Sequence, residues 1–299
     1  MKRLMMLAAL VLLLGVAACA AAEPVTGMGL TFDSGDTHID FGDVRIEDDR
    51  FDEIVALLDQ LPNLTSADMY AGSMKTSTYE VLAERYPNVR FGWTVRVGDH
   101  RVRTDATAFS TLHDPLKDKP HYNESFKGLK FCKDLKALDI GHNEINDLSF
   151  LSELTGLKVL ILACNDIKDI SVIAQMKELE YLELFTNPIT DITPIAELTN
   201  LRDLNLSNLK IDDLTPLYDL PNLERFRLCM NNILTDEQRA EFEAQYPDVI
   251  IGWKDHPTGE GWRDHPNYDV ISRVFRGGVY EPFASREENQ QRLASGEYD

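Results

Sequence analysis

Leucine recurs every 22 residues through the middle of this chain, and that period restricts the possible folds more than any other feature. Most units follow the pattern L-x-x-L-x-L-x-x-N-x-I. A single unit buries only part of its apolar side chains, so neighbouring units must stack to complete a core. We therefore expect a solenoid in which short strands lie side by side in one parallel sheet. The units begin at Leu135, Leu157, Leu179, Leu201 and Leu223.

Two of these units read "LKALDIGHNEINDLSFLSELTG" from residue 135 and "LEYLELFTNPITDITPIAELTN" from residue 179. Over residues 129–235 this signature resembles the internalin-type leucine-rich repeat of bacterial surface proteins. The resemblance implies an α/β leucine-rich repeat solenoid, a horseshoe with a curved parallel sheet and short helical turns on its convex side. It also implies a scaffold that binds another macromolecule, although a fold alone does not fix a function.

The segments that flank the regular repeats resemble each other. One ends in "YPNVRFGW" at residues 86–93 and the other in "YPDVIIGW" at residues 246–253, each after a helix-like run. We therefore expect irregular, longer repeats at both ends. The predicted organisation is a signal peptide (1–18), a tether (19–36), N-terminal irregular repeats (37–97), an insertion or loop (98–128), regular repeats (129–235), a C-terminal helix–strand repeat with an aromatic cap (236–285) and a polar tail (286–299).

The start of the chain has the features of a targeting segment. Lys2 and Arg3 precede an apolar run over residues 4–16, which is short for a membrane span and fits a signal peptide. The run is followed by a V-A-A-C sequence ending at Cys19, which resembles the bacterial lipobox. The resemblance implies lipidation of Cys19 and anchoring on the extracytoplasmic side of a bacterial membrane. Ordinary signal cleavage followed by secretion is the alternative.

Charge and cysteine content narrow the functional classes. Loss of residues 1–18 would remove two of the 30 basic residues, leaving 28 against 50 acidic ones, a net charge of −22. Such a surface repels nucleic acid, so we expect no nucleic-acid partner. The three later cysteines, Cys132, Cys164 and Cys229, form no disulfide framework. Cys164 and Cys229 are three strands apart in the repeat register, too far for a bridge, and we expect free thiols and a monomer.

Two polar columns run through the repeats. Asn143, Asn165, Asn187 and Asn231 are placed to bond backbone groups where the chain leaves each strand. Asp147, Asp169, Asp191 and Asp213 each stand two residues before a serine or threonine, and proline follows in two of the four units. Calcium binding is one reading of this acidic column. A serine or threonine before proline is a helix-start signal, however, in which the hydroxyl caps free backbone amides. This reading favours capping and turn bonding over calcium binding.

Chemistry-bearing motifs are absent from the sequence, which contains no G-x-S-x-G, no phosphate loop and no H-E-x-x-H. We expect no enzymatic activity, no cofactor and no metal. In the strand pattern the x positions face the concave side, and several of them carry apolar, aromatic or charged side chains that are typical of interfaces. Strand propensity alone would also favour such side chains. The predicted partner-binding residues are Val159, Ile161, Tyr181, Glu183, Phe185, Arg225 and Arg227.

The stretch "GWKDHPTGEGWRDHPN", residues 252–267, repeats a Gly-Trp-basic-Asp-His-Pro phrase. Histidine before proline at this spacing is no established metal-ligand rule, so a cap over the end of the solenoid is the favoured reading. Its aromatic residues are Trp253, Trp262, Tyr268, Phe275 and Tyr280.

Three functions remain open. The first is protein binding at the bacterial cell surface through the concave face. The second is glycan binding through tryptophan and tyrosine residues of the cap or of that face. The third is a structural spacer without a ligand. The insertion at residues 98–127 is a further candidate surface, because long loops on solenoids often carry binding function.

Overall fold

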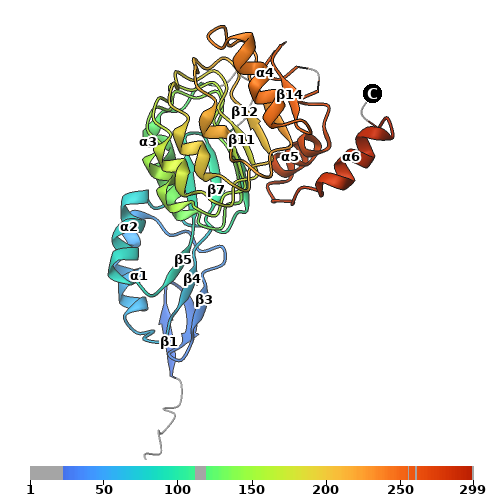
Figure 1. The fold of residues 1–299 in the computed structure, drawn as a ribbon. Helices are drawn as coiled ribbons and strands as arrows, with labels where there is room; N and C mark the ends of the chain where they lie inside the picture. Colours follow the sequence, from blue (N-terminus) through green and yellow to red (C-terminus); the bar gives the residue numbers. More distant parts are fainter. Residues whose placement is uncertain (1–22, 112–118, 255, 260, 298–299) are drawn as a thin grey trace, which may run out of the picture.

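The structure is a computed structural model and describes residues 23–111, 119–254, 256–259 and 261–297 (Figure 1). The predicted signal peptide and Cys19 lie outside the described residues. The part that is described contains no helix long and apolar enough to cross a membrane.

The N-terminal part is a small strand–helix unit (Figure 1, blue to cyan). Three parallel strands, β3 (His38–Asp40), β4 (Ser66–Asp68) and β5 (Arg90–Gly92), form its sheet. Helices α1 (Phe51–Leu58) and α2 (Thr76–Arg85) connect them. Residues 24–33, predicted as part of a tether, instead form an antiparallel hairpin of β1 (Pro24–Gly27) and β2 (Leu30–Asp33). Val25 of this hairpin is buried, which explains why the segment is ordered.

The predicted insertion also proves to be largely ordered structure. A second antiparallel hairpin, β6 (Thr94–Val97) and β7 (His100–Arg103), separates the first parallel sheet from the second. Residues 108–110 then form β8 (Ala108–Ser110), which pairs in parallel with the first predicted repeat strand. Helix α3 (Asn123–Phe126) and the 3-10 turn η2 (Lys127–Phe131) complete the segment. The solenoid therefore begins one strand earlier than the period of 22 residues indicates.

Seven parallel strands form the main sheet, in the order β14 to β8 without interruption. Successive repeats pair in register, so that Leu138, Leu160, Leu182 and Leu204 are neighbours across the sheet. These leucines point into a continuous core and are completely buried. The strands that follow β8 are β9 (Ala137–Asp139), β10 (Val159–Ile161), β11 (Tyr181–Glu183), β12 (Asp203–Asn205), β13 (Arg225–Arg227) and β14 (Ile250–Gly252).

Short 3-10 turns close the convex side of each repeat, which confirms the predicted solenoid. Their apolar side chains, such as Leu151, Ile173 and Ile195, are completely buried against the strand leucines. Helix α4 (Asp236–Gln245) replaces the 3-10 turn in the last repeat, and Thr235 and Gln238 form a capping box at its start. The turns are η3 (Ser149–Glu153), η4 (Ser171–Gln175), η5 (Thr193–Glu197) and η6 (Thr215–Leu217).

The asparagine column acts as predicted. Asn165 donates from Nδ2 to the carbonyls of Ile140 at 3.1 Å and Leu162 at 3.0 Å, and its Oδ1 accepts from the amide of Ile145 at 3.0 Å. One buried side chain thus satisfies backbone groups of two adjacent repeats, which ties them in register.

The aspartate column caps turns, but through a different atom from the one expected. The carboxylate, not the serine or threonine hydroxyl, accepts the free amide: Ser171 N donates to Asp169 Oδ1 at 2.8 Å. The same bond recurs at Asp147, Asp191 and Asp213. The bond from the Ser171 amide lowers the pKa of Asp169.

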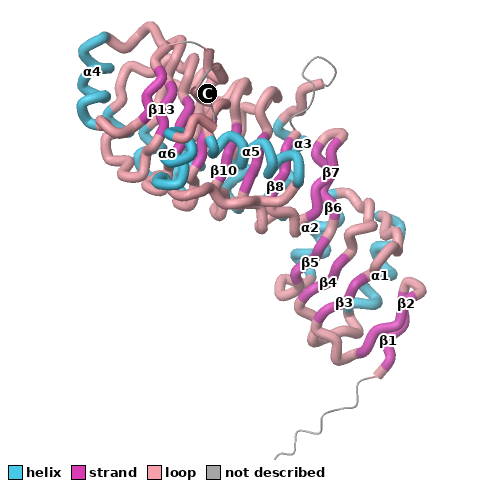
Figure 2. Tube along the Cα trace, turned by 90° about the vertical axis from the view of Figure 1, so that its right-hand side faces the viewer, coloured by secondary structure: helices cyan, strands magenta, loops and turns pink. Residues whose placement is uncertain are grey.

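Two further helices follow the last strand, α5 (Pro266–Gly277) and α6 (Arg286–Ala294). Figure 2 shows α5 lying across the strands of the main sheet, with α6 continuing along the same side. The predicted polar tail therefore contains a docked helix. Most of the predicted cap does not cover the end of the solenoid. It lies over the inner face of the main sheet instead.

Candidate functional site

Helix α5 has clear local reasons to form over residues 266–277. His265 is its N-cap and accepts a hydrogen bond on Nδ1 from the amide of Asn267 at 3.2 Å, and Pro266 occupies the first turn. Gly278 ends the helix in the left-handed conformation, with φ of 66°. Val270, Ile271 and Val274 lie on one side and are buried. This pattern gives α5 an apolar face that needs a partner.

The inner face of the sheet is that partner. A second apolar core, separate from the core between strands and convex turns, forms between the sheet and α5. Val159, Tyr181 and Phe185 contribute from the strands, and Trp262 and Val270 contribute from the C-terminal segment. We call residues 256–259 and 261–297 the C-terminal cover, because they enclose this face.

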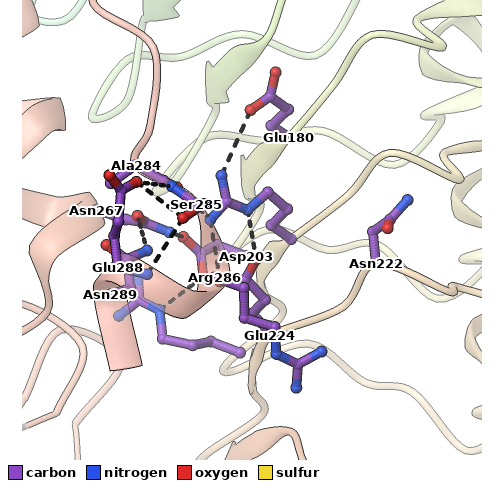
Figure 3. Close-up of polar contacts among 12 residues, drawn as sticks. Glu180, Asp203, Asn222, Glu224, Asn267, Ala284, Ser285, Arg286, Glu288 and Asn289 are labelled. Carbon is purple, nitrogen blue, oxygen red and sulfur yellow. Dashed lines mark hydrogen bonds and ion pairs between the residues drawn. The ribbon is translucent and has the colours of Figure 1, made fainter. Parts of the chain in front are cut away.

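A buried polar network fixes the C-terminal cover in place (Figure 3). Arg225 donates from Nε to Asp203 Oδ1 at 2.7 Å, and the two side chains are 1% and 0% exposed. Asn267 of α5 donates to the other oxygen of Asp203 at 2.6 Å, and Asn289 of α6 donates to Asn267 at 2.7 Å. Burial opposes ionisation of Asp203, but the charge and hydrogen bond of Arg225 prevail and hold its pKa below the usual value.

Trp262 connects the same network to the next strand. Its indole Nε1 donates to Glu183 Oε1 at 2.7 Å, and the Tyr181 hydroxyl donates to the same oxygen. The guanidinium of Arg225 lies 4.2 Å from the centre of the Trp262 ring, within cation–π range, and donates to the Trp262 carbonyl. Burial raises the pKa of Glu183, while the two hydrogen bonds act in the opposite direction. The inner face thus has its charged groups bonded within the protein.

A groove of about 820 Å³ remains open along one edge of this covered face. We call it the edge groove. Its floor is formed by Ile161, Ala163 and Phe185, and one wall is formed by Tyr268, Ile271 and Phe275 around α5. The opposite wall is a ridge of residues that occupy equivalent positions in successive repeats, where the chain turns out of each strand. The ridge comprises His142, Cys164, Thr186, Asn208 and Met230.

The backbone of the ridge has an uncommon conformation. All five residues have positive φ, between 56° and 60°, a region that favours glycine and asparagine. Only Asn208 belongs to those types; the β-branched Thr186 is the least expected. Four of the five side chains are exposed and Cys164 is half-buried. The turn that follows each strand therefore presents one side chain per repeat to the groove, and the type of this residue varies from repeat to repeat.

The repeat architecture agrees with a family model. Residues 155–197 match the model for leucine-rich repeats in two copies. The fold is a leucine-rich repeat solenoid. Comparison with curated protein sequences finds no match to this chain.

Solved structures with similarity to this leucine-rich repeat solenoid include two internalins of Listeria monocytogenes. For internalin C2 the identity is 25% and the TM-score 0.41, with coverage of 66% of this chain and 74% of that chain. For internalin InlF the identity is 20% and the TM-score 0.43, covering 77% of this chain and 55% of that chain. A leucine-rich repeat protein of Leptospira interrogans is 18% identical with a TM-score of 0.38, covering 66% of this chain and 50% of that chain.

The prediction of an exposed concave patch is wrong. All seven of its residues are buried, from 0% exposure at Tyr181 to 8% at Ile161, because the C-terminal cover packs on the inner face. Ile161, Glu183 and Phe185 still reach the edge groove. The other four do not line it, and they are Val159, Tyr181, Arg225 and Arg227.

The repeated tryptophan–histidine phrase has structural roles. Trp253 packs on Phe226 and Phe242 at the end of the solenoid, as a cap should. Trp262 instead belongs to the C-terminal cover, packs on the inner face of the sheet and is only 2% exposed. His265 caps α5, and His256 contacts the hydroxyl of Thr258. No group of three or more possible metal ligands occurs within the described ranges.

Sequence reasoning missed the ridge and the helix wall of the edge groove. The signal for the wall was present: residues 270, 271, 274 and 275 are apolar at helical spacing, directly after a His-Pro helix start. The ridge had no such signal, since the residue before each repeat asparagine varies between units.

Proposed function

We propose that this leucine-rich repeat protein is a non-enzymatic scaffold that recognises a protein partner through the edge groove, at the surface of a bacterial cell. The observation that carries the proposal is the groove itself. Its floor and helix wall present Phe185 and Phe275 beside exposed polar ridge residues, in the size range of ligand sites. An accessible apolar surface with a polar rim is typical of a binding site rather than of a spacer.

Binding at the bare inner face is disfavoured by the contacts of the cover. Removing the cover would separate Asp203 from Asn267 and Glu183 from Trp262, and would expose a complete apolar core. A partner would have to replace all of these contacts. The edge groove needs no such rearrangement, so recognition there is the simpler arrangement.

The location at the envelope rests on the N-terminal sequence. Lipidation at Cys19 would tether the solenoid to the membrane, and cleavage elsewhere would release it. The strongly acidic surface, with a net charge of −20 for the whole chain, supports the expectation that nucleic acid is not the partner. A monomer is the expected form.

Glycan binding by stacking on Trp262 is not supported, because that ring is buried in the core that the cover forms with the inner face of the sheet. The other tryptophan and tyrosine residues of the predicted cap, Trp253, Tyr268 and Tyr280, are half-buried, and Tyr268 is the one of these three that lines the edge groove. No further contact favours a sugar over a peptide.

Site-specific photocrosslinking tests the proposed function. A photoreactive phenylalanine analogue is placed at Met230 or Thr186 in the ridge, and as control at Val81, which is 51% exposed on α2 and lies outside the groove. In the producing cells, we expect adducts of one discrete mass from both ridge positions and none from the control. Modification of Cys164 with a bulky maleimide should abolish them. Identical adducts from the control position would overturn the proposal.

A further inference from the structure

We infer that the edge groove binds an extended peptide segment of about six residues that carries an acidic side chain near each end and apolar side chains between them. This inference rests on the proposed function and specifies the chemistry of the partner. It follows from the length of the groove, the position of its charges and the character of its floor.

Two independent lengths define the groove. The five ridge residues come from successive repeats, and strands in a sheet are about 4.8 Å apart, so the ridge spans roughly 19 Å. The opposite wall is the 12-residue helix α5, which at about 1.5 Å per residue is roughly 18 Å long. A fully extended chain rises about 3.3 to 3.6 Å per residue, so five or six residues match both walls.

The cations of the groove lie near the two ends of its helix wall. Arg276 is in the last turn of α5, towards β8, and Arg263 packs on the ring of Tyr268 in the first turn. Both side chains are exposed, and neither forms an ion pair with any residue in the described ranges. Arg276 donates from Nε to the carbonyl of Ser272. Arg263 lies over the Tyr268 ring and interacts electrostatically with the buried Glu183 carboxylate.

The acidic groups of the groove are already bonded. Asp139 accepts from the amide of Gly141 and from the Ser110 hydroxyl, and Glu183 accepts from Tyr181 and Trp262. Both carboxylates are less than 5% exposed. In a chain with a net charge of −20, the accessible charges of the groove are therefore positive. Such a surface favours an anionic ligand.

The middle of the groove is apolar on the floor and polar along the ridge. Ile161 and Phe185 form the floor, whereas Thr186 and Asn208 expose a hydroxyl and an amide beside it. In an extended peptide alternate side chains point to opposite sides, so one set can enter the floor while backbone groups face the ridge. A fatty acyl chain would use the floor but leave the polar ridge and the second arginine without a role. A peptide with acidic ends would contact the apolar floor, the polar ridge and both arginines.

Pools of dye-labelled hexapeptides, acetylated and amidated at their ends, test the inference by fluorescence anisotropy. One pool has Asp or Glu at positions 1 and 6, Leu, Ile or Phe at positions 2 and 4, and Ser elsewhere. A second pool has Lys at positions 1 and 6, and a third has Ser at positions 2 and 4. The protein is the full chain carrying Cys19→Ser. Of its cysteines in the described ranges, Cys164 is partly exposed, and Cys132 and Cys229 are buried.

The acidic, apolar pool should bind at least ten-fold more tightly than either other pool. The double variant Arg263→Glu and Arg276→Glu should remove that preference. The matched control, Lys168→Glu with Lys210→Glu, makes the same change in net charge at exposed positions outside the groove and should leave it intact.

Each other outcome has a distinct meaning. Equal binding of acidic and basic pools, lost after maleimide modification of Cys164, would overturn the inference and leave the proposed function standing. Binding that survives this modification would place the site elsewhere and remove both. Failure of every pool to bind, or binding of oleate with displacement of the acidic pool, would also overturn the peptide inference.

Discussion

Arg225 and Asp203 stand one repeat apart in the same column of the inner face and form an ion pair of 2.7 Å that is almost completely enclosed. Each also bonds to the C-terminal cover, Asp203 to Asn267 and Arg225 to the Trp262 carbonyl. Asp203 and Arg225 lie at strand positions that would face solvent without the cover. In the protein they hold the C-terminal cover on the inner face. This relationship explains why the inner face is a second core.

The anchor predicts an asymmetric response to substitution. Arg225→Met should lower the free energy of unfolding by about 3 to 5 kcal/mol, because it leaves the Asp203 carboxylate buried without its main partner. The double variant Asp203→Leu with Arg225→Met should recover part of this loss, since an apolar pair of similar size carries no buried charge but leaves the Asn267 amide without its acceptor. Urea unfolding of the three proteins measures both effects. A loss below about 1 kcal/mol for Arg225→Met would show that the pair is hydrated.

Burial of His265 predicts a specific pH dependence of stability. Burial, with a contribution from Arg225, lowers the pKa of His265 to about 4, whereas the unfolded value is 6.5. The folded state therefore resists protonation between these values while the unfolded state takes up the proton. Stability present above pH 6.5 should fall as the pH drops towards 4, by roughly 3 kcal/mol.

His265→Asn is the matched control for this effect, because asparagine is also a good N-cap but does not titrate. Its stability at pH 7 should be near that of the parent, and its decline between pH 6.5 and 4 should be smaller. Chemical denaturation at both pH values measures the difference. Parallel pH profiles for the two proteins would refute the assignment.

The asparagine column predicts a large cost at a single amide. Asn165→Ala should destabilise the protein by about 2 to 4 kcal/mol, because several buried backbone groups lose a partner at once. Asn200→Ala is a suitable control, since Asn200 donates one exposed bond to the Lys177 carbonyl. It should cost less than about 1 kcal/mol. Thermal and urea unfolding measure both variants. Equal losses of stability for Asn165→Ala and Asn200→Ala would contradict the role of the column.

Tyr181 distinguishes a covered face from an open one. Its ring packs between Trp262 and Phe283, with centroid distances of 5.9 and 6.0 Å. Tyr181→Ala should therefore cost about 3 to 5 kcal/mol, as for other large-to-small changes in a core. Tyr122→Ala, at an aromatic residue that is 59% exposed, should change stability by no more than about 0.5 kcal/mol. A similarly small effect at Tyr181 would indicate an open inner face.

The repeat period predicted the solenoid, the inward leucines and the asparagine column because each depends on contacts between equivalent positions of neighbouring units. Leu160 meets Leu138 and Leu182 for the same reason that every other unit stacks. These contacts are encoded locally and repeated, so that a single sequence is enough to find them.

The cover depends on contacts that occur once. Asn267 meets Asp203 across 64 positions of sequence and Trp262 meets Glu183 across 79, and no periodicity links them. The x positions of the strands therefore appeared solvent-facing. The paired charges of Asp203 and Arg225 in one column, together with an amphipathic helix after the last strand, were the available signs of a covered face.

The rate of thiol modification tests the central claim, that the C-terminal cover closes the inner face over Val159 and leaves the edge groove accessible. Cys164 lies on the ridge and is half-buried, whereas Val159 lies under the cover and is 1% exposed. The full chain with Cys19→Ser is compared with the same chain carrying Cys164→Ser and Val159→Cys, using Ellman's reagent under native conditions. We predict rapid reaction of Cys164 and reaction of the introduced thiol at least 100-fold more slowly. Equal rates at the two positions would contradict the account, because they would show that the inner face is open.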